Sequence, residues 1–307
     1  MAGAGLALFS VGFAQQANDP AQFNKTRAWK DLVTQCDFGP RPPETIAHLK
    51  TRDYIVSEMK KSCDSVRLQP FEHTWSINGK VQHMWNIIGE QNWASSKTRV
   101  VLFAHWDTRP EADQEKDPVK QKMPIPGADD GASETAILLE LARVLKVQPA
   151  KVGVMYVFVD GEDLGPSEQE MYLGADVFAQ SLPDPKANYG ILLDMVGNTG
   201  VKVPKEQESE QYAPSLENAL YEFAAKIGLG ETFPDVQGPA IDDDHIPINK
   251  AGLPTIDLID FMGYYYTYWH TLQDTPEHCS PESLYKVGYL MQEWLRKPEP
   301  FRIGATR

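Results

Sequence analysis

Two apolar runs, TRVVLFAH at residues 98–105 and VGVMYVFVD at residues 152–160, decide the fold of this 307-residue chain. Neither run shows the apolar–polar alternation of a half-exposed strand, so we predict strands that are buried on both faces. YGILLD at 189–194 and LPTIDLI at 253–259 have the same character. A helical pattern from Ser133 to Lys146 lies between the first two runs. This alternation predicts an α/β fold, with a mixed, mostly parallel twisted sheet flanked by helices on both faces.

The segments around these strands predict further elements. Asn78-Gly79 is typical of a hairpin turn and lies between expected strands at 65–77 and 81–89. The polar run EQESEQ at 206–211 predicts a solvated loop. Apolar spacing predicts helices over 21–35, 45–61, 167–181, 214–227 and 280–296. Because the sequence has no internal repeat and no linker, we expect a single globular domain over residues 20–300.

Charge and cysteine content exclude several classes of protein. The chain has 43 acidic and 29 basic residues, a net charge of -14 at pH 7. That balance argues against a nucleic-acid partner and against docking on anionic membranes. The sequence contains no apolar stretch long enough for a transmembrane helix. Three Cys cannot support a disulfide scaffold, although Cys36 and Cys63 could pair if the protein is exported.

Residues 1–14, MAGAGLALFSVGFA, are small or apolar and uncharged, and the polar QQANDP follows them. This pattern predicts the remnant of a secretory signal with Ala14 before the cut. The first basic residue is Lys25, so the signal is apparently truncated at its basic end. We therefore expect a periplasmic or secreted protein. The alternative is a frayed apolar N-terminus of a cytoplasmic protein.

Carboxylates and histidines gather at the ends of the predicted strands. His105 ends the first strand and Asp107 follows it, Glu162 and Asp163 follow the second, and Asp194 ends the third. In open α/β sheets the ligand crevice lies outside the carboxyl ends of the strands, so these side chains are expected at one rim. Two further candidates, Asp130 in GADDGASE and His270 in YWHTLQDT, lie in predicted loops.

Two His and several carboxylates from separate strand ends suit a zinc ion. An Asp at a strand end is most often a turn former, and a lone His is most often structural. Six such residues together favour a metal site. In the adjacent pair, one of Glu162 and Asp163 can bind metal while the other faces the substrate as a base. The sequence has no GxSxG, P-loop, HExxH or GxGxxG motif that would support other chemistry.

Five segments give these residues a family resemblance. In order along the chain they are HWDTRP at 105–110, GADDGAS at 127–133, DGEDLG at 160–165, LLDMVG at 192–197 and WHTLQDT at 269–275. The set is similar to the metal-site segments of the zinc-dependent aminopeptidase superfamily, and the match runs over nearly the whole chain. It implies a zinc exopeptidase-like catalytic domain.

Within that superfamily the chain resembles the glutaminyl-peptide cyclotransferases, or glutaminyl cyclases, of bacterial type. IDDDHIPINKAG at 241–252 is similar to the DDHIPF segment of the cyclases, and HWDTRPEAD at 105–113 is similar to their HYDSRPxAD. Trp269 precedes His270, where the cyclases carry a shielding Trp. Asp257 departs from the pattern, because animal cyclases have His there, and their Trp after the acidic pair is missing. The competing activity is that of a metallo-aminopeptidase.

The resemblance implies roles residue by residue. Asp130, Asp163 and His270 would hold the catalytic Zn²⁺, with Asp129 shaping the turn. His105 and Asp194 occupy the positions of a possible second metal site. The cofactor would be one Zn²⁺ per subunit for a cyclase, and two for an aminopeptidase. Glu162, Asp194 and Asp243 would be the catalytic residues and Trp269 would bind substrate.

The implied reaction is an acyl transfer, in which N-terminal glutamine of a peptide or protein cyclises to pyroglutamate and releases ammonia. In the aminopeptidase alternative Glu162 would activate water instead. The aromatic run Tyr264-Tyr265-Tyr266 could help to build a dry pocket, or could be a packing cluster. A third hypothesis, a binding domain without activity, has little support because every expected ligand and the base are present. We expect a monomer whose partners are peptide substrates.

Overall fold

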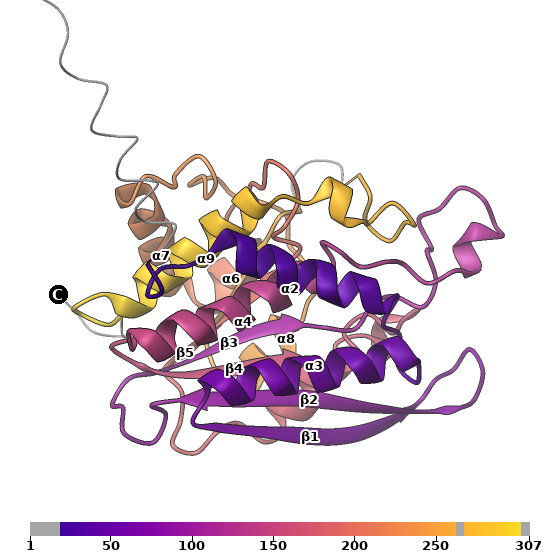
Figure 1. Ribbon diagram of the computed structural model, residues 1–307, viewed down its shortest axis with the longest axis horizontal. Helices are drawn as coiled ribbons and strands as arrows, with labels where there is room; N and C mark the ends of the chain where they lie inside the picture. The colour runs from indigo at the N-terminus through magenta and orange to yellow at the C-terminus, as the bar shows by residue number, and fades with distance from the viewer. Residues whose placement is uncertain (1–18, 262–266, 302–307) are drawn as a thin grey trace, which may run out of the picture.

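The computed structural model describes residues 19–261 and 267–301 (Figure 1). Its centre is a six-stranded sheet in the order β1-β2-β4-β3-β5-β6. The strand bounds are Ser65–Thr74 for β1, Val81–Gln91 for β2, Arg99–His105 for β3, Gly153–Val159 for β4, Tyr189–Asp194 for β5 and Thr255–Ile259 for β6. The β1–β2 and β2–β4 pairs are antiparallel, whereas β4–β3, β3–β5 and β5–β6 are parallel. The prediction of a single α/β domain with a mixed, mostly parallel sheet is confirmed.

Helices cover both faces of the sheet, as the unbroken apolar runs require. Val100 and Leu102 of β3 pack into one apolar cluster, with α2 (Lys25–Phe38), α3 (Ile46–Ser62), α4 (Ala132–Val147) and α9 (Pro281–Arg296). Val101 and Phe103 pack into a second cluster, with α5 (Leu173–Ala179) and α8 (His245–Lys250). Successive side chains of a strand point to opposite faces, so both sets of β3 residues are removed from water. Figure 1 shows α2, α3, α4 and α9 layered over one side of the sheet.

Three local expectations were wrong. The region 206–211 is not a loop, because α6 (Gln207–Tyr212) forms there and Glu206 caps it by accepting hydrogen bonds from the backbone N–H groups of Glu208 and Ser209. The helix expected over 167–181 is divided into a short 3₁₀ turn (Glu168–Glu170) and α5. Helix α8 was not expected, and its Pro247 lies within its first turn. The remaining helix, α7 (Pro214–Lys226), and 3₁₀ turns at Lys120–Lys122 and Pro276–His278 complete the fold.

The structure also bears on the N-terminal segment, the tyrosine run, the cysteines and the question of a membrane-spanning helix. The signal remnant at 1–14 and Tyr264-Tyr265-Tyr266 lie outside the described residues. Cys36 and Cys63 are both free, so the pairing considered above does not form in this structure. Over the described ranges, the structure contains no helix with the length and apolar character needed to cross a membrane.

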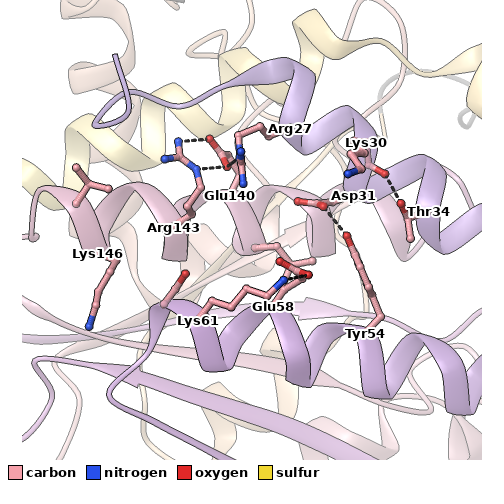
Figure 2. Close-up of a pocket in the computed structure, with 13 residues that line it drawn as sticks. Arg27, Lys30, Asp31, Thr34, Tyr54, Glu58, Lys61, Glu140, Arg143 and Lys146 are labelled. Carbon is pink, nitrogen blue, oxygen red and sulfur yellow. Dashed lines mark hydrogen bonds and ion pairs between the residues drawn. The ribbon is translucent and has the colours of Figure 1, made fainter. Parts of the chain in front are cut away.

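A cavity of about 600 Å³ lies between α2, α3 and α4 (Figure 2). Its charged side chains pair mostly with one another. Arg143 contacts Glu140 at 2.6 Å, Lys61 contacts Glu58 at 2.5 Å, and the Tyr54 hydroxyl donates to Asp31 at 2.6 Å. The Tyr54–Asp31 hydrogen bond links α3 to α2, and Arg27 of α2 lies 3.5 Å from Glu140 of α4. The cavity contains none of the candidate metal ligands.

Candidate active site

The carboxyl ends of β3, β4 and β5 bring the predicted residues together. His105 is the last residue of β3, and Asp194 is the last residue of β5. Glu162 and Asp163 follow β4, separated from it by Asp160 and Gly161. These strands are neighbours in the sheet, so the rim expected from the sequence exists. The side chains on it are nearly inaccessible, with exposed fractions of 1% for His105, 7% for Glu162 and 8% for Asp194.

Asp130, Asp163 and His270 form the first group of potential metal ligands. Each offers one ligand atom, and these atoms all lie within 4.8 Å of one another. The Nε2 atom of His270 is 3.2 Å from Oδ1 of Asp163 and 3.8 Å from Oδ2 of Asp130. Asp163 is fully buried, and its Oδ2 atom accepts no hydrogen bond from any residue that the structure describes. Such an unpaired buried carboxylate oxygen is costly unless a cation binds it.

His105, Asp194 and Glu134 form a second group of the same kind. The Nε2 atom of His105 is 3.1 Å from Oδ1 of Asp130, 3.1 Å from Oε1 of Glu134 and 3.4 Å from Oδ1 of Asp194. Glu134 was not predicted from the sequence. It follows Asp130 by one helical turn in GADDGASE, and that spacing places both side chains on one side of the start of α4.

Two buried carboxylates position the backbone of the ligand segments. Asp107 accepts hydrogen bonds from the N–H groups of Glu162 and Asp163, each at 3.2 Å. Asp274 does the same for the N–H groups of Asp129 and Asp130, at 2.8 and 3.2 Å. Each carboxylate therefore fixes two consecutive residues, one of which is a candidate ligand.

Asp129 has the turn-forming position expected for it. Its Oδ1 atom accepts from the N–H of Gly197 at 2.6 Å, just beyond β5. Its carbonyl accepts from the hydroxyl of Ser133 at 2.8 Å. Asp129 thus ties the turn before α4 to the loop after β5 and leaves Asp130 to face His105 and His270.

Glu162 lies among further acidic side chains. Burial, followed by the negative charge of Asp163, raises the pKa of Glu162 well above its ordinary value. Burial and the charge of Asp194 likewise raise the pKa of Asp243. A carboxyl group with a raised pKa near the working pH can both accept and return a proton. Glu162 therefore has the electrostatic environment of a general acid–base residue.

A third buried group consists of Asp243, His245 and Asp257, whose potential ligand atoms also lie within 4.8 Å of one another. The side-chain hydrogen-bond partner of Asp257 is the carboxyl group of Asp243. The Nε2 atom of His245 is 3.2 Å from Oε2 of Glu206, the cap of α6. Burial and the charge of Asp194 raise the pKa of Asp257, so its neutral form is favoured beside Asp243.

Trp269 stacks on the candidate ligand His270. The ring centroids are 3.8 Å apart and the planes are tilted by 24°. Phe261 meets the same indole edge-on at 5.4 Å. The aromatic side chain therefore lies directly beside the first ligand group.

The chain belongs to peptidase family M28. The sequence profile of this family matches residues 86–295. That range includes every ligand and acid–base candidate described above, and it confirms the resemblance found in the sequence. The family and its zinc-named members support zinc as the metal.

Individual relatives include both cyclases and peptidases. The crystal structure of Tannerella forsythia glutaminyl cyclase is 36% identical, with a TM-score of 0.86, over 91% of this chain and 100% of that chain. The glutaminyl-peptide cyclotransferase of Drosophila melanogaster is 27% identical over 76% of this chain and 70% of its own length. Aminopeptidase YwaD of Bacillus subtilis is 30% identical over 67% of this chain, and the match spans only 43% of that longer protein.

Proposed function

We propose that this protein is a zinc-dependent glutaminyl-peptide cyclotransferase, which converts N-terminal glutamine of peptides or proteins to pyroglutamate and releases ammonia. One observation carries the proposal. A buried acid, Glu162, lies beside a His–Asp–Asp ligand group, and Trp269 stacks on the His of that group. The cyclases among the relatives agree with it across nine-tenths of the chain.

In this proposal Asp130, Asp163 and His270 hold one Zn²⁺ per chain. The donor set of one imidazole and two carboxylates, with an unpaired buried oxygen on Asp163, fits that ion. When bound, zinc supplies Lewis-acid polarisation of the γ-amide carbonyl of the substrate.

Glu162 moves the proton. It takes a proton from the α-amine as the amine nitrogen forms a bond to the γ-amide carbon, and it returns that proton to the departing nitrogen as the C–N bond of the amide breaks. In this proposal Asp243 takes part in the proton relay and Asp194 helps to orient it, and the charge of Asp194 contributes to the raised pKa of both Glu162 and Asp243. The reaction is intramolecular, so orienting the bent side chain supplies a large part of the rate.

Trp269 packs on the substrate and excludes water. Water exclusion matters because water or hydroxide at this site would attack the substrate carbonyl, and the substrate would be hydrolysed instead of cyclised. The finer parts of the proposal are the peptide substrate, the single zinc, a monomeric state and an exported location.

An aminopeptidase is the second candidate. The observation that favours it is the second ligand group around His105, which could complete a two-metal centre. In that case Glu162 would activate water for attack on the first peptide bond.

Mass spectrometry of a Gln-initiated peptide incubated with the zinc-loaded protein tests the proposal. Loss of ammonia from an intact chain supports a cyclase. Release of free glutamine and a shortened peptide supports the aminopeptidase and contradicts the proposal. No change in mass, with zinc bound and the protein folded, contradicts both.

A further inference from the structure

A second cavity, of about 490 Å³, lies beside the candidate active site. We call it the Tyr172 cavity. Residues of the 3₁₀ turn after β4, of α5 and of α8 line it, and it is open to solvent. Its lining residues are Glu168, Gln169, Met171, Tyr172, Asp176, Asp242, Ile246, Pro247 and Lys250.

Tyr172 connects this cavity to the acid–base residues. Its backbone N–H donates to the carbonyl of Glu162 at 3.0 Å. Its hydroxyl donates to the carbonyl of Asp242 at 2.5 Å, and Asp242 directly precedes Asp243. One side chain in the cavity wall therefore spans the two chain segments that carry Glu162 and Asp243. Each further extended residue of a peptide whose first residue lies at Glu162 adds roughly 3.3–3.6 Å of reach towards this wall.

The chemistry of the Tyr172 cavity is amphipathic. Met171, Ile246 and Pro247 provide apolar, half-buried surface. Glu168, Asp176 and Asp242 are exposed, and no described residue forms an ion pair with any of these three carboxylates. Lys250 is the single cation among the lining residues. A side chain with an apolar stem and a positive end matches this combination, because the stem can cover the apolar surface while the charge stays near the carboxylates.

We propose that the Tyr172 cavity is a specificity subsite that accepts a lysine or arginine side chain from the second or third residue of the peptide substrate. This inference rests on the proposed cyclase function. It assigns to the chain a preference among Gln-initiated peptides, which neither the ligand group nor Glu162 can supply. A glutamate at the same substrate position meets three carboxylates and is disfavoured.

The test compares kcat/KM for four otherwise identical peptides, with Lys or Glu at position two or at position three after N-terminal Gln. At low ionic strength we expect the Lys peptide to exceed the Glu peptide by about fivefold at one of the two positions, the size expected for exposed charge pairs. Added salt should reduce the ratio. The double variant Asp176→Asn/Asp242→Asn should bring the ratio close to one, and Lys250→Gln should raise it.

Matched controls separate a local subsite from the overall negative charge. Asp53→Asn/Glu72→Gln changes the net charge by the same amount at exposed positions outside the cavity, and should leave the ratio unchanged. A ratio near one in the wild type, with every peptide cyclised, overturns the subsite and leaves the cyclase proposal intact. An equal loss of preference in both double variants also overturns it. Failure to cyclise any of the peptides contradicts the proposed function instead.

Discussion

Arg109 donates a hydrogen bond from Nη1 to Oδ1 of Asp163 at 2.9 Å, and the same oxygen faces Nε2 of His270 at 3.2 Å. Asp113 closes the ring, because its Oδ2 accepts from Arg109 and its Oδ1 lies 3.0 Å from Nδ1 of His270. Although burial disfavours the charged carboxylate, His270 and Arg109 hold the pKa of Asp163 below its ordinary value. Two residues of HWDTRPEAD thus support two candidate ligands that lie far apart in the sequence.

This ring predicts an effect of Asp113 on zinc affinity. The Asp113 carboxylate orients the imidazole of His270 by accepting from Nδ1, which leaves Nε2 free for metal. Asp113→Ala should weaken zinc binding by about 10-fold to 100-fold, the usual range for such supporting residues. Competition with a chromophoric chelator measures the affinity. Glu111→Ala is the matched control, since Glu111 lies in the same loop and pairs with Lys122. Equal affinities in the two variants would show that the ring does not support the metal.

Glu162→Gln should abolish turnover and leave zinc bound. The amide has nearly the same shape as the carboxyl group but cannot take the proton, so kcat should fall by at least about 100-fold. Metal analysis of the same preparation is the control, because Glu162 is not among the proposed ligands. Retained turnover, or loss of zinc together with turnover, would remove Glu162 from its proposed role.

Part of the site could be predicted because three of its residues lie at recognisable strand ends. His105, Asp163 and Asp194 follow apolar runs, and parallel strands deliver them to one rim. Glu134 was missed because it lies in the first turn of α4, where an acidic residue is ordinary as a helix-capping side chain. It has that role here as well, since its Oε1 accepts from the N–H of Gly131 at 2.7 Å.

The segment 206–211 shows a second reason why some local structure could not be predicted from the sequence. EQESEQ is polar, and its composition alone indicates a loop. In the structure Ser209 is fully buried and its hydroxyl accepts from the N–H of Asp257 at 2.8 Å, while Glu206 pairs with His245. These polar residues form a short helix because partners from α8 and β6, distant in sequence, satisfy them. A pattern read along one segment contains no information on such partners.

Zinc stoichiometry should distinguish the two ligand groups. For a cyclase we expect one tightly held zinc per chain. Asp130→Asn should remove it, whereas Glu134→Gln should retain it, because Glu134 belongs only to the group around His105. Elemental analysis after dialysis against a weak chelator gives the count. Two zinc ions in the wild type and one in Glu134→Gln would instead support the two-metal aminopeptidase.

Asp31 predicts a pH-dependent contribution to stability outside the active site. It lies in the cavity between α2, α3 and α4, where its carboxylate accepts a hydrogen bond from the hydroxyl of Tyr54 (Figure 2). Burial raises the pKa of Asp31 to about 6 from 3.8. Well below pH 4 the group is protonated in the folded and unfolded states alike. Between about pH 4 and 6 it ionises in the unfolded chain before it does in the folded protein, so the stability of the folded protein falls over this range and levels off above it.

Asp31→Asn should therefore stabilise the protein at pH 8, by about 1–2 kcal/mol, and have little effect near pH 4. The amide oxygen can still accept from Tyr54, so the packing of α2 on α3 is retained. Urea unfolding at pH 4, 5, 6 and 8 gives the free energy of unfolding for both proteins. Asp53→Asn, on the exposed side of α3, is the control for the loss of one negative charge. A constant difference between Asp31→Asn and the wild type across this range would mean that Asp31 titrates as it does in the unfolded chain.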